Sequence, residues 1–470
     1  SSVTPSASPP ARSASASSGA QDAVHGEHRR ARHRRLDGAR RVAAEAVRDV
    51  ERPHHADAGD ADADIEEVDQ PLRLEAGGDD RRVGGGQPPA VFSSPTRRRP
   101  TATPGPTAAR TAASPSPVTS HWSPVTPLFY TPPMDYRRLG HTGLTVSRLC
   151  LGTMMFGRWG NADADDCVRI IDAALDQGIN FIDTANRYNW GESEEIVGRA
   201  VRGKRDGVVL ATKVFMPGAG GRLDRGTSRR HIMLQVEESL RRLGTDWIDL
   251  YQLHRHDRDT PIEEVLSALD DLVRQGKVRY LGVSTGHAAD PVDLQWQGWR
   301  MVEALWVADR RGWERIVCTQ PPYSIFSRDV ERDVFPVCER FGIGAIVWSP
   351  LEGGWLAGRY RQGQPPPPDS RATNESEFGM FVREAFDMNS PRSRRRLEVV
   401  EQLVPLADEL GVSLAAYSQG WALRHPAVTS LIVGPRLMRH LDAGLEALAV
   451  RIPDAHLERI DALVPPGSRS

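Results

Sequence analysis

The chain contains very little lysine. Only three of its 470 residues are lysines, Lys204, Lys213 and Lys277, although Lys and Arg together number 60. A lysine kept in a chain that otherwise uses arginine is a candidate for chemistry, because a buried ammonium can be tuned to gain or lose its proton, a role that a guanidinium lacks. The net charge is only −2. The whole chain therefore gives no electrostatic reason to expect a nucleic-acid partner or an acidic membrane surface.

Cysteine and long apolar runs are also scarce. The four cysteines form no CxxC pair and follow no regular spacing, which predicts reduced, buried thiols and a cytoplasmic protein. No apolar run approaches the roughly 20 residues that cross a bilayer, and the N-terminus lacks the apolar segment of a signal peptide. No HxxxH, cysteine cluster or spacing of paired carboxylates indicates a metal site. The cysteines are Cys150, Cys167, Cys318 and Cys338.

Residues 1–133 have few apolar side chains. They include one isoleucine, Ile65, and four aromatic residues, three of them near the end of the segment. Because so little apolar surface cannot offset the loss of chain entropy, we predict a disordered extension. Its basic run, His28–Arg35, is interpreted as a solvated tail or a translated leader, with nucleic-acid contact or an address signal as the alternative. Met134 would be a natural initiator, which predicts that the working protein begins there.

From 134 to 470 the chain has the pattern of one α/β domain. Residues 134–153 alternate apolar and polar around two glycines, which predicts a β-hairpin leading into a strand. Eight apolar runs, each followed by a helix, predict a closed (β/α)8 barrel rather than an open sheet. Gly218–Gly221 does not open a GxGxxG fingerprint, since Leu223 stands at the third glycine position. The expected strands are 147–153, 179–185, 208–214, 247–254, 278–284, 315–320, 344–350 and 429–434.

Helices and two long loops fill the intervals. Four stretches with helical periodicity each end at a glycine: 164–178, 228–244, 261–276 and 330–342. Two long segments, 285–300 and 352–394, follow strands and are predicted to rise over the barrel mouth as lids or binding loops. Aromatic residues near the expected mouth indicate an apolar-walled pocket, or else they close the barrel rim. They are Phe156, Trp159, Trp190, Phe215 and Trp355.

The strongest chemical signal lies where three successive strands end. One expected strand stops at Asp183, with Tyr188 five residues later. The next expected strand carries Lys213 near its end, and the third ends at His254. Because barrel strands converge at their carboxyl ends, these side chains can meet. A lysine cation beside the tyrosine lowers its pKa from about 10, a buried aspartate keeps the lysine charged, and a histidine can orient a substrate oxygen. The set suits protonation of a carbonyl oxygen while hydride reaches its carbon.

Each of these residues has another interpretation when taken alone. Asp183 could cap a turn, and Tyr188 could be a packing residue. A single histidine at a strand end is more often a satisfied core residue, and His256 competes with His254 for the role. Only the four together, in this order and spacing, favour the chemical interpretation.

The motifs IDTANRY, ATKV, YQLH, GVS and WSPL make residues 134–465 resemble the aldo-keto reductase superfamily, in the branch similar to potassium-channel β subunits. The resemblance implies Asp183, Tyr188, Lys213 and His254 as catalytic residues, with the tyrosine as proton donor. It implies reversible reduction of a small-molecule aldehyde or ketone by NADPH, less often NADH, bound across the barrel mouth. The implied cofactor-binding residues are Gly152, Thr153, Asp183, Ser284, Thr285, Gln320, Trp348, Ser349, Pro350, Leu351, Gly353, Gly358, Gly434, Arg436 and His440.

The resemblance also implies which of these residues would contact each part of the cofactor. Ser284 and Gln320 would contact the nicotinamide, and Trp348 would stack on its ring. The backbone of 349–358 would wrap the pyrophosphate. Gly434 and Arg436 would lie near the 2′-phosphate of the adenosine.

The chain also departs from the family pattern. Thr285 replaces the usual asparagine, and His440 and Gly444 stand where glutamine and asparagine are common, which bears on the preference for NADPH. The alternative function is a cofactor-binding regulatory subunit that turns over slowly and reports redox state. The sequence does not name the substrate or decide whether the protein is a homo-oligomer.

Overall fold

The computed structural model describes residues 134–217, 221–286, 294–368, 370–375 and 386–470. The disorder and the basic run predicted within residues 1–133 lie outside the described residues, as does most of the predicted GAGG loop. The domain boundary at Met134 stays a prediction.

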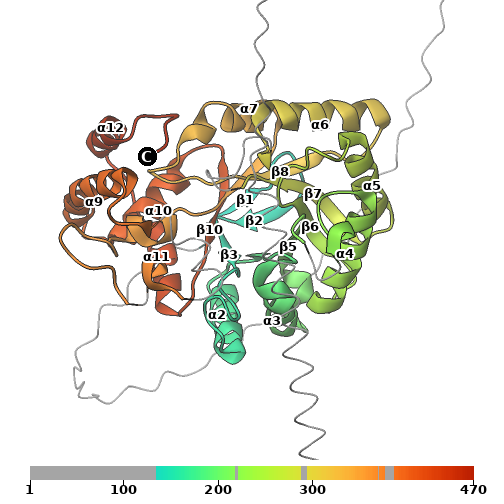
Figure 1. The fold of residues 1–470 in the computed structure, drawn as a ribbon, viewed down its shortest axis with the longest axis horizontal. Helices are drawn as coiled ribbons and strands as arrows, with labels where there is room; N and C mark the ends of the chain where they lie inside the picture. Colours follow the sequence, from blue (N-terminus) through green and yellow to red (C-terminus); the bar gives the residue numbers. More distant parts are fainter. Residues whose placement is uncertain (1–133, 218–220, 287–293, 369, 376–385) are drawn as a thin grey trace, which may run out of the picture. The chain divides into compact units, whose positions relative to one another are not determined.

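Eight parallel strands close into a barrel with helices around it (Figure 1). The strands follow one another around the barrel in sequence order, and the last pairs with the first. The predicted (β/α)8 architecture is confirmed, since each expected run overlaps one of the eight strands and only β10 begins outside its run, by one residue. They are β3 (Leu149–Gly152), β4 (Phe181–Asp183), β5 (Val209–Val214), β6 (Ile248–Leu253), β7 (Val278–Ser284), β8 (Ile316–Gln320), β9 (Gly344–Val347) and β10 (Val428–Val433).

The predicted hairpin is present ahead of the barrel. Strands β1 (Tyr136–Arg138) and β2 (Thr145–Ser147) pair antiparallel, with Arg137 opposite Val146. Leu139 and Val146 are fully buried and pack on the inward side chains of the barrel, among them Phe181. The hairpin therefore closes the end of the barrel opposite the carboxyl ends of the strands.

The helices begin and end much as the sequence predicts. Asp163 caps the first of them by accepting from the backbone N–H groups of Asp165 and Asp166, and Gly244 ends another at a φ of 63°. The helices are α2 (Ala164–Asp176), α3 (Glu192–Val201), α4 (Arg229–Leu243), α5 (Ile262–Arg274), α6 (Gly298–Arg311), α7 (Val334–Phe341), α9 (Pro391–Glu409), α10 (Leu414–Arg424), α11 (Arg439–Ala447) and α12 (Asp454–Leu463). Short 3-10 turns are η1 (Tyr188–Gly191), η2 (Arg205–Gly207), η3 (Gly221–Leu223), η5 (Asp329–Glu331), η6 (Glu352–Ala357) and η7 (Arg371–Thr373).

Two boundaries differ from the prediction. The helix expected from 330 begins only at Val334, because residues 329–331 form the separate turn η5. The first long loop is shorter than expected, since α6 begins at Gly298 and Trp299 is a helical residue. In the second long loop, Phe378 and Phe381 lie outside the described residues, whereas Phe386 is buried against Trp355 and Tyr360.

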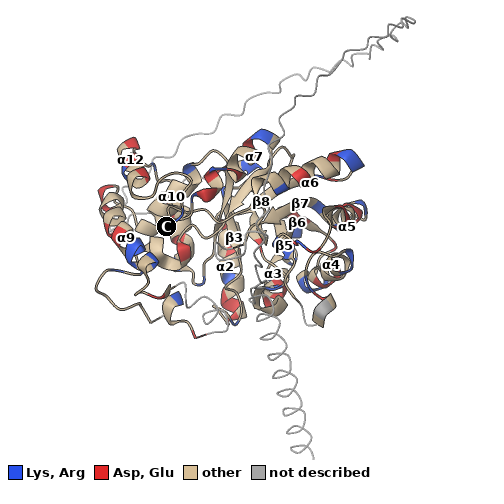
Figure 2. Ribbon diagram, turned by 45° about the horizontal axis from the view of Figure 1, so that its top comes forward, with Lys and Arg blue, Asp and Glu red and all other residues tan. Residues whose placement is uncertain are grey.

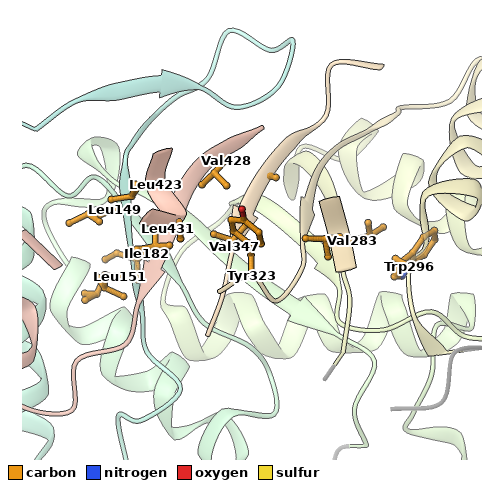
Figure 3. Close-up of a cluster of buried hydrophobic side chains, with 14 of the residues drawn as sticks. Leu149, Leu151, Ile182, Val283, Trp296, Tyr323, Val347, Leu423, Val428 and Leu431 are labelled. Carbon is orange, nitrogen blue, oxygen red and sulfur yellow. The ribbon is translucent and has the colours of Figure 1, made fainter. Parts of the chain in front are cut away.

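Side chains on the strands alternate between two apolar layers. Outward residues such as Leu149, Leu151 and Ile182 pack beneath the helices, as Figure 3 shows. Inward residues such as Cys150 and Phe181 fill the barrel. Charged residues lie mainly on the surrounding helices (Figure 2). The same alternation turns Asp183 inward, two residues after Phe181, at the carboxyl end of the barrel.

The described residues agree with the expected thiol chemistry. All four cysteines are buried and unpaired.

Among the described helices none is long and apolar enough to cross a membrane. The described part of the chain also has no group of three or more His, Cys, Asp or Glu side chains that could hold a metal ion.

Candidate active site

Asp183, Lys213 and Tyr188 meet at the carboxyl end of the barrel. The Lys213 ammonium forms an ion pair with Asp183 Oδ1 and donates to the Thr184 carbonyl oxygen at 2.9 Å and to Tyr188 Oη at 3.2 Å. The Lys213 side chain is fully buried and that of Asp183 is 3% exposed. Because a buried ammonium is costly without a partner, the carboxylate is what keeps the lysine charged here.

The pKa shifts of this pair have opposing causes. Burial by itself would lower the pKa of Lys213, but Asp183 and Tyr188 outweigh it and raise that pKa above its ordinary value. Burial raises the pKa of Tyr188 above 10.0, and Lys213 offsets only part of that rise. This net direction differs from our expectation, because burial, the largest cause, outweighs the effect of Lys213 on the tyrosine pKa, and Asp183 raises that pKa further. At neutral pH, Tyr188 is therefore a phenol with a proton to donate.

His254 lies beside the tyrosine. Its ring is 5.8 Å from that of Tyr188, edge-on at 81°, and its backbone N–H bonds the Val214 carbonyl oxygen at 2.8 Å. Burial, and then the positive charges of Lys213 and Arg255, lower its pKa well below 6.5, so the ring is neutral at pH 7. Its Nδ1 is buried with no hydrogen-bond partner among the described residues. The competing His256 instead contacts Trp296, with ring centroids 5.3 Å apart.

The loop that carries Tyr188 is held by an asparagine that our sequence reasoning missed. Asn189 accepts from the Trp159 backbone N–H at 2.6 Å and donates to the carbonyl oxygens of Met154 and Phe156, both at 2.9 Å. Asn189 and Trp190 have φ angles of 51° and 61°, in the left-handed region that few side chains adopt. Strained backbone of this kind is concentrated at functional sites. The sequence carried no signal of it, because NW is not a typical left-handed pair.

Several residues of the predicted cofactor-binding set, among them the predicted nicotinamide contacts Ser284 and Gln320, lie at the carboxyl ends of barrel strands. Thr153 Oγ1 is 3.1 Å from the Asp183 carbonyl oxygen, Ser284 Oγ donates to the Gln320 carbonyl oxygen at 3.0 Å, and Thr285 Oγ1 donates to the Trp296 carbonyl oxygen at 3.1 Å. These hydroxyl protons are engaged with the protein, so the oxygens remain as acceptors. Gly152 packs tightly against β10, since a Cβ there would lie 2.5 Å from Ile432 Cγ2.

The segment predicted to wrap the pyrophosphate has an unusual backbone. Trp348 follows β9, is half-buried, and its backbone bonds Pro321 and Tyr323. Left-handed φ angles then recur at Ser349 (60°), Gly353 (69°) and Gly358 (68°). The backbone N–H groups of Glu352, Gly354 and Gly358 donate to carbonyl oxygens within the segment, so it is a series of tight turns whose glycines allow another group to approach the backbone closely.

A buried glutamate holds this segment in place. Glu352 has a φ of 47° and is 6% exposed. Its carboxylate accepts from Ser324 Oγ at 3.0 Å, Ser327 Oγ at 2.8 Å and Arg396 Nη2 at 3.1 Å. Arg396 in turn donates to the Ser470 carbonyl oxygen at 3.0 Å. The segment is thereby tied to α9 and to the last residues of the chain.

Replacing Glu352 with glutamine tests this tie. We expect the free energy of unfolding to fall by about 1.5–3 kcal/mol, the cost of losing charge-assisted hydrogen bonds in a buried site. Denaturant unfolding midpoints measure it. The matched control is Glu398→Gln, which removes an exposed pair with Arg395 and should change stability by less than about 0.5 kcal/mol. Equal midpoints for the two variants would show that Glu352 does not support the segment.

The residues predicted for the adenosine end lie after β10, Gly434 and Arg436 ahead of α11 and His440 in its first turn. Gly434 is exposed, with open space where a side chain would stand. The Arg436 backbone N–H donates to His440 Nδ1 at 3.3 Å, and its carbonyl oxygen accepts from Asn161 at 3.0 Å. Arg371, which sequence reasoning missed, lies close enough to interact electrostatically with Arg436: burial lowers the pKa of Arg371, and Arg436 lowers it as well, while Tyr360 and Glu352 oppose the shift. The sequence did not single out Arg371, because it is one of several arginines in this part of the chain.

The aromatic residues expected at the mouth divide into two groups. Phe156 and Trp355 are completely buried and close the barrel rim, with Trp355 4.7 Å from Tyr360 between ring centroids. Trp190 is 37% exposed and the Arg187 guanidinium lies 2.9 Å from its ring centroid. Trp190 and Phe215 are thus partly exposed, whereas Phe156, Trp159 and Trp355 are buried.

Comparison with known proteins bears directly on this site. The sequence model of the family described as "Aldo/keto reductase family" matches residues 148–465, which span every strand of the barrel. The chain belongs to the aldo/keto reductase family.

Its relatives in that family carry different names. The chain is 37% identical over 349 residues to an uncharacterized oxidoreductase, YrpG, of Bacillus subtilis, covering 72% of this chain and 98% of the relative. It is 35% identical over 325 residues to a probable voltage-gated potassium channel subunit beta of Arabidopsis thaliana, covering 67% and 92%. It is 32% identical over 352 residues to the versiconal hemiacetal acetate reductase of Aspergillus parasiticus, covering 70% and 96%. The predicted resemblance to the family, and to its potassium-channel branch, is confirmed.

Proposed function

We propose that this protein reduces an aldehyde or ketone with a nicotinamide cofactor, and oxidises suitable alcohols in reverse. One observation carries the proposal: the buried chain of contacts from Asp183 through Lys213 to the Tyr188 hydroxyl. The reductase and oxidoreductase names of two relatives support the same reaction class.

The residues present fit a nicotinamide dinucleotide. Acceptor oxygens at Ser284 and Thr285 suit a carboxamide, and the glycine-containing left-handed turns of 349–358 suit the close approach of a pyrophosphate. Bound there, the reduced cofactor would supply hydride to the carbonyl carbon.

In this proposal the side chains handle the proton. Tyr188 Oη gives its proton to the carbonyl oxygen as that oxygen gains negative charge. Lys213, 3.2 Å away, stabilises the phenolate that forms, and Asp183 keeps the lysine charged and in place. Neutral His254 offers a ring N–H that orients the substrate oxygen. Solvent then returns a proton to the tyrosine.

NADPH is the cofactor that we propose over NADH. Arg436 lies in the segment predicted for the adenosine end, and its charge acts on Arg371, so two guanidinium groups contribute positive charge where a 2′-phosphate would lie. We also propose a cytoplasmic location, on the ground that all four thiols are buried and unpaired.

A second candidate function is a redox-reporting regulatory subunit. It is favoured by the similarity to the potassium channel β subunits of Arabidopsis thaliana and of Oryza sativa. Such a protein would bind the cofactor and turn over slowly.

Steady-state assays separate the two functions. The purified chain is mixed with NADPH or NADH and a panel of simple aldehydes and ketones, and the loss of reduced-nicotinamide absorbance is followed. We expect turnover of at least one carbonyl, about 1 s⁻¹ or faster, with a lower KM for NADPH. Quenching of NADPH fluorescence without turnover on any carbonyl would favour the regulatory function. No binding of either cofactor would exclude both.

A further inference from the structure

The barrel interior directly beneath Tyr188 contains a layer of three polar side chains, from alternate strands β4, β6 and β8. They are Asp183, Gln252 and Gln320, all of which are buried. In barrels of this architecture, alternate strands contribute the side chains of one layer. Two residues earlier on the same strands lie the fully buried apolar side chains Phe181, Leu250 and Cys318. A glutamine in place of another apolar residue at 252 therefore has a cost that a function must offset.

Gln252 connects the other two members of the layer. Its Nε2 donates to Asp183 Oδ2 at 3.0 Å, and its Oε1 accepts from Gln320 Nε2 at 3.2 Å. Gln320 Nε2 also donates to Asp183 Oδ2, at 2.8 Å. Both hydrogens of the Gln320 amide nitrogen are thus used, which fixes the orientation of the amide and leaves its Oε1 as the free acceptor.

The neighbouring strand makes room for this connection. Gly282 is the β7 partner of Gln252, and a Cβ at Gly282 would lie 3.0 Å from Gln252 Cγ. A side chain on β7 would push the glutamine out of its place across the barrel. The absence of one lets Gln252 reach both Asp183 and Gln320.

We propose that Gln252 is a positioning residue for the reaction: it holds the Asp183 carboxylate against Lys213 and fixes the Gln320 amide with its oxygen toward the cofactor. The proposal rests on the reductase function proposed above. Asp183 raises the pKa of Tyr188. An N–H dipole directed at Asp183 Oδ2 offsets part of the carboxylate field, so Gln252 makes the phenolate easier to form.

Two replacements of Gln252 test the role through the pH profile. Gln252→Leu removes both hydrogen bonds at similar volume, and we expect kcat/KM to fall about 10- to 100-fold, the effect of one or two bonds to a charged group. In alcohol oxidation, which needs the phenolate, the rise of kcat/KM with pH should shift to higher pH. Gln252→Glu should act as glutamine does while its carboxyl is protonated, and lose activity as that carboxyl ionises beside Asp183. Acid pH should thus rescue Gln252→Glu but not Gln252→Leu.

Tyr251→Phe controls for disturbance of β6. Tyr251 is fully buried on the adjacent, outward side, and its hydroxyl has no hydrogen-bond partner among the described residues. This variant should keep the wild-type pH profile. If Gln252→Leu also kept the wild-type profile and kcat/KM, or if Gln252→Glu showed no acid rescue, the positioning role would be overturned.

A second readout does not depend on turnover. Since the chain has only three lysines, protein labelled with ¹³C at lysine Cε gives three signals, which Lys204→Arg and Lys277→Arg assign. In Gln252→Glu the Lys213 signal should move between about pH 5 and about pH 8 as the introduced carboxyl titrates, while the other two stay constant. A Lys213 signal that does not move overturns the proposal even in an active enzyme. If the Lys213 signal moves in Gln252→Glu but the wild-type protein turns over no carbonyl, the contact is retained and the reductase function is rejected.

Discussion

Replacing Tyr188 with phenylalanine is expected to lower kcat for carbonyl reduction by about 10²- to 10⁴-fold, the usual contribution of a positioned general acid. The ring, and with it the edge-on contact to His254, is retained, and only the hydroxyl 3.2 Å from Lys213 is lost. Binding of NADPH, measured by fluorescence quenching, should change little. Loss of reduction with retained binding would assign the proton to Tyr188. Equal kcat for the variant and the wild type would show that another group is the acid.

The same proton transfer predicts opposite pH dependences for carbonyl reduction and alcohol oxidation. Because the pKa of Tyr188 is raised, the phenol is protonated across the neutral range, and reduction should decline only as pH rises through that value. Alcohol oxidation requires the phenolate and should rise over the same interval. Tyr188→Phe should abolish both limbs. Tyr251→Phe, a buried tyrosine outside the barrel interior, should leave both unchanged.

Site residues that stand at the ends of apolar runs could be predicted from the sequence, whereas a residue defined by a contact across the barrel could not. The strands are apolar runs that alternate with helices, so their ends, and with them Asp183, Lys213 and His254, could be placed without coordinates. Gln252 could not, because its meaning comes from a contact across the barrel with Gln320, 68 positions further along the chain. A glutamine inside an apolar run carries no information about which face of the strand it occupies until the register is known.

The expectation that Lys213 would lower the pKa of Tyr188 was wrong because it, too, depends on the three-dimensional structure. The attraction of a lysine can be argued from residue types alone, but the cost of removing water from the phenolate depends on burial in three dimensions. In the folded chain that cost is the largest contribution to the Tyr188 shift. The left-handed backbone at Asn189 and Trp190 is likewise imposed by tertiary contacts, namely the three hydrogen bonds of the Asn189 amide.

Replacing Lys213 with methionine is expected to destabilise the fold by about 3–5 kcal/mol, because it leaves the buried Asp183 carboxylate without its cation. Urea unfolding at pH 7 measures the loss. Since the folded-state pKa of Lys213 is raised, the pair contributes its full stability below the unfolded lysine pKa of about 10.4. That contribution is lost as pH rises through the higher folded value. The difference between variant and wild type should therefore shrink only at strongly alkaline pH.

The matched control uses another of the three lysines. Lys204 pairs with Asp172 at 2.6 Å, with the two side chains 48% and 41% exposed, and Lys204→Met should cost less than about 1 kcal/mol. A double variant, Lys213→Met with Asp183→Asn, should recover part of the lost stability, because no uncompensated charge remains. Activity should not recover with it, since the phenolate of Tyr188 would lack its cation. If Lys213→Met were as stable as Lys204→Met, the buried ion pair would not hold the site together. If the double variant regained turnover, the lysine would have only a structural role.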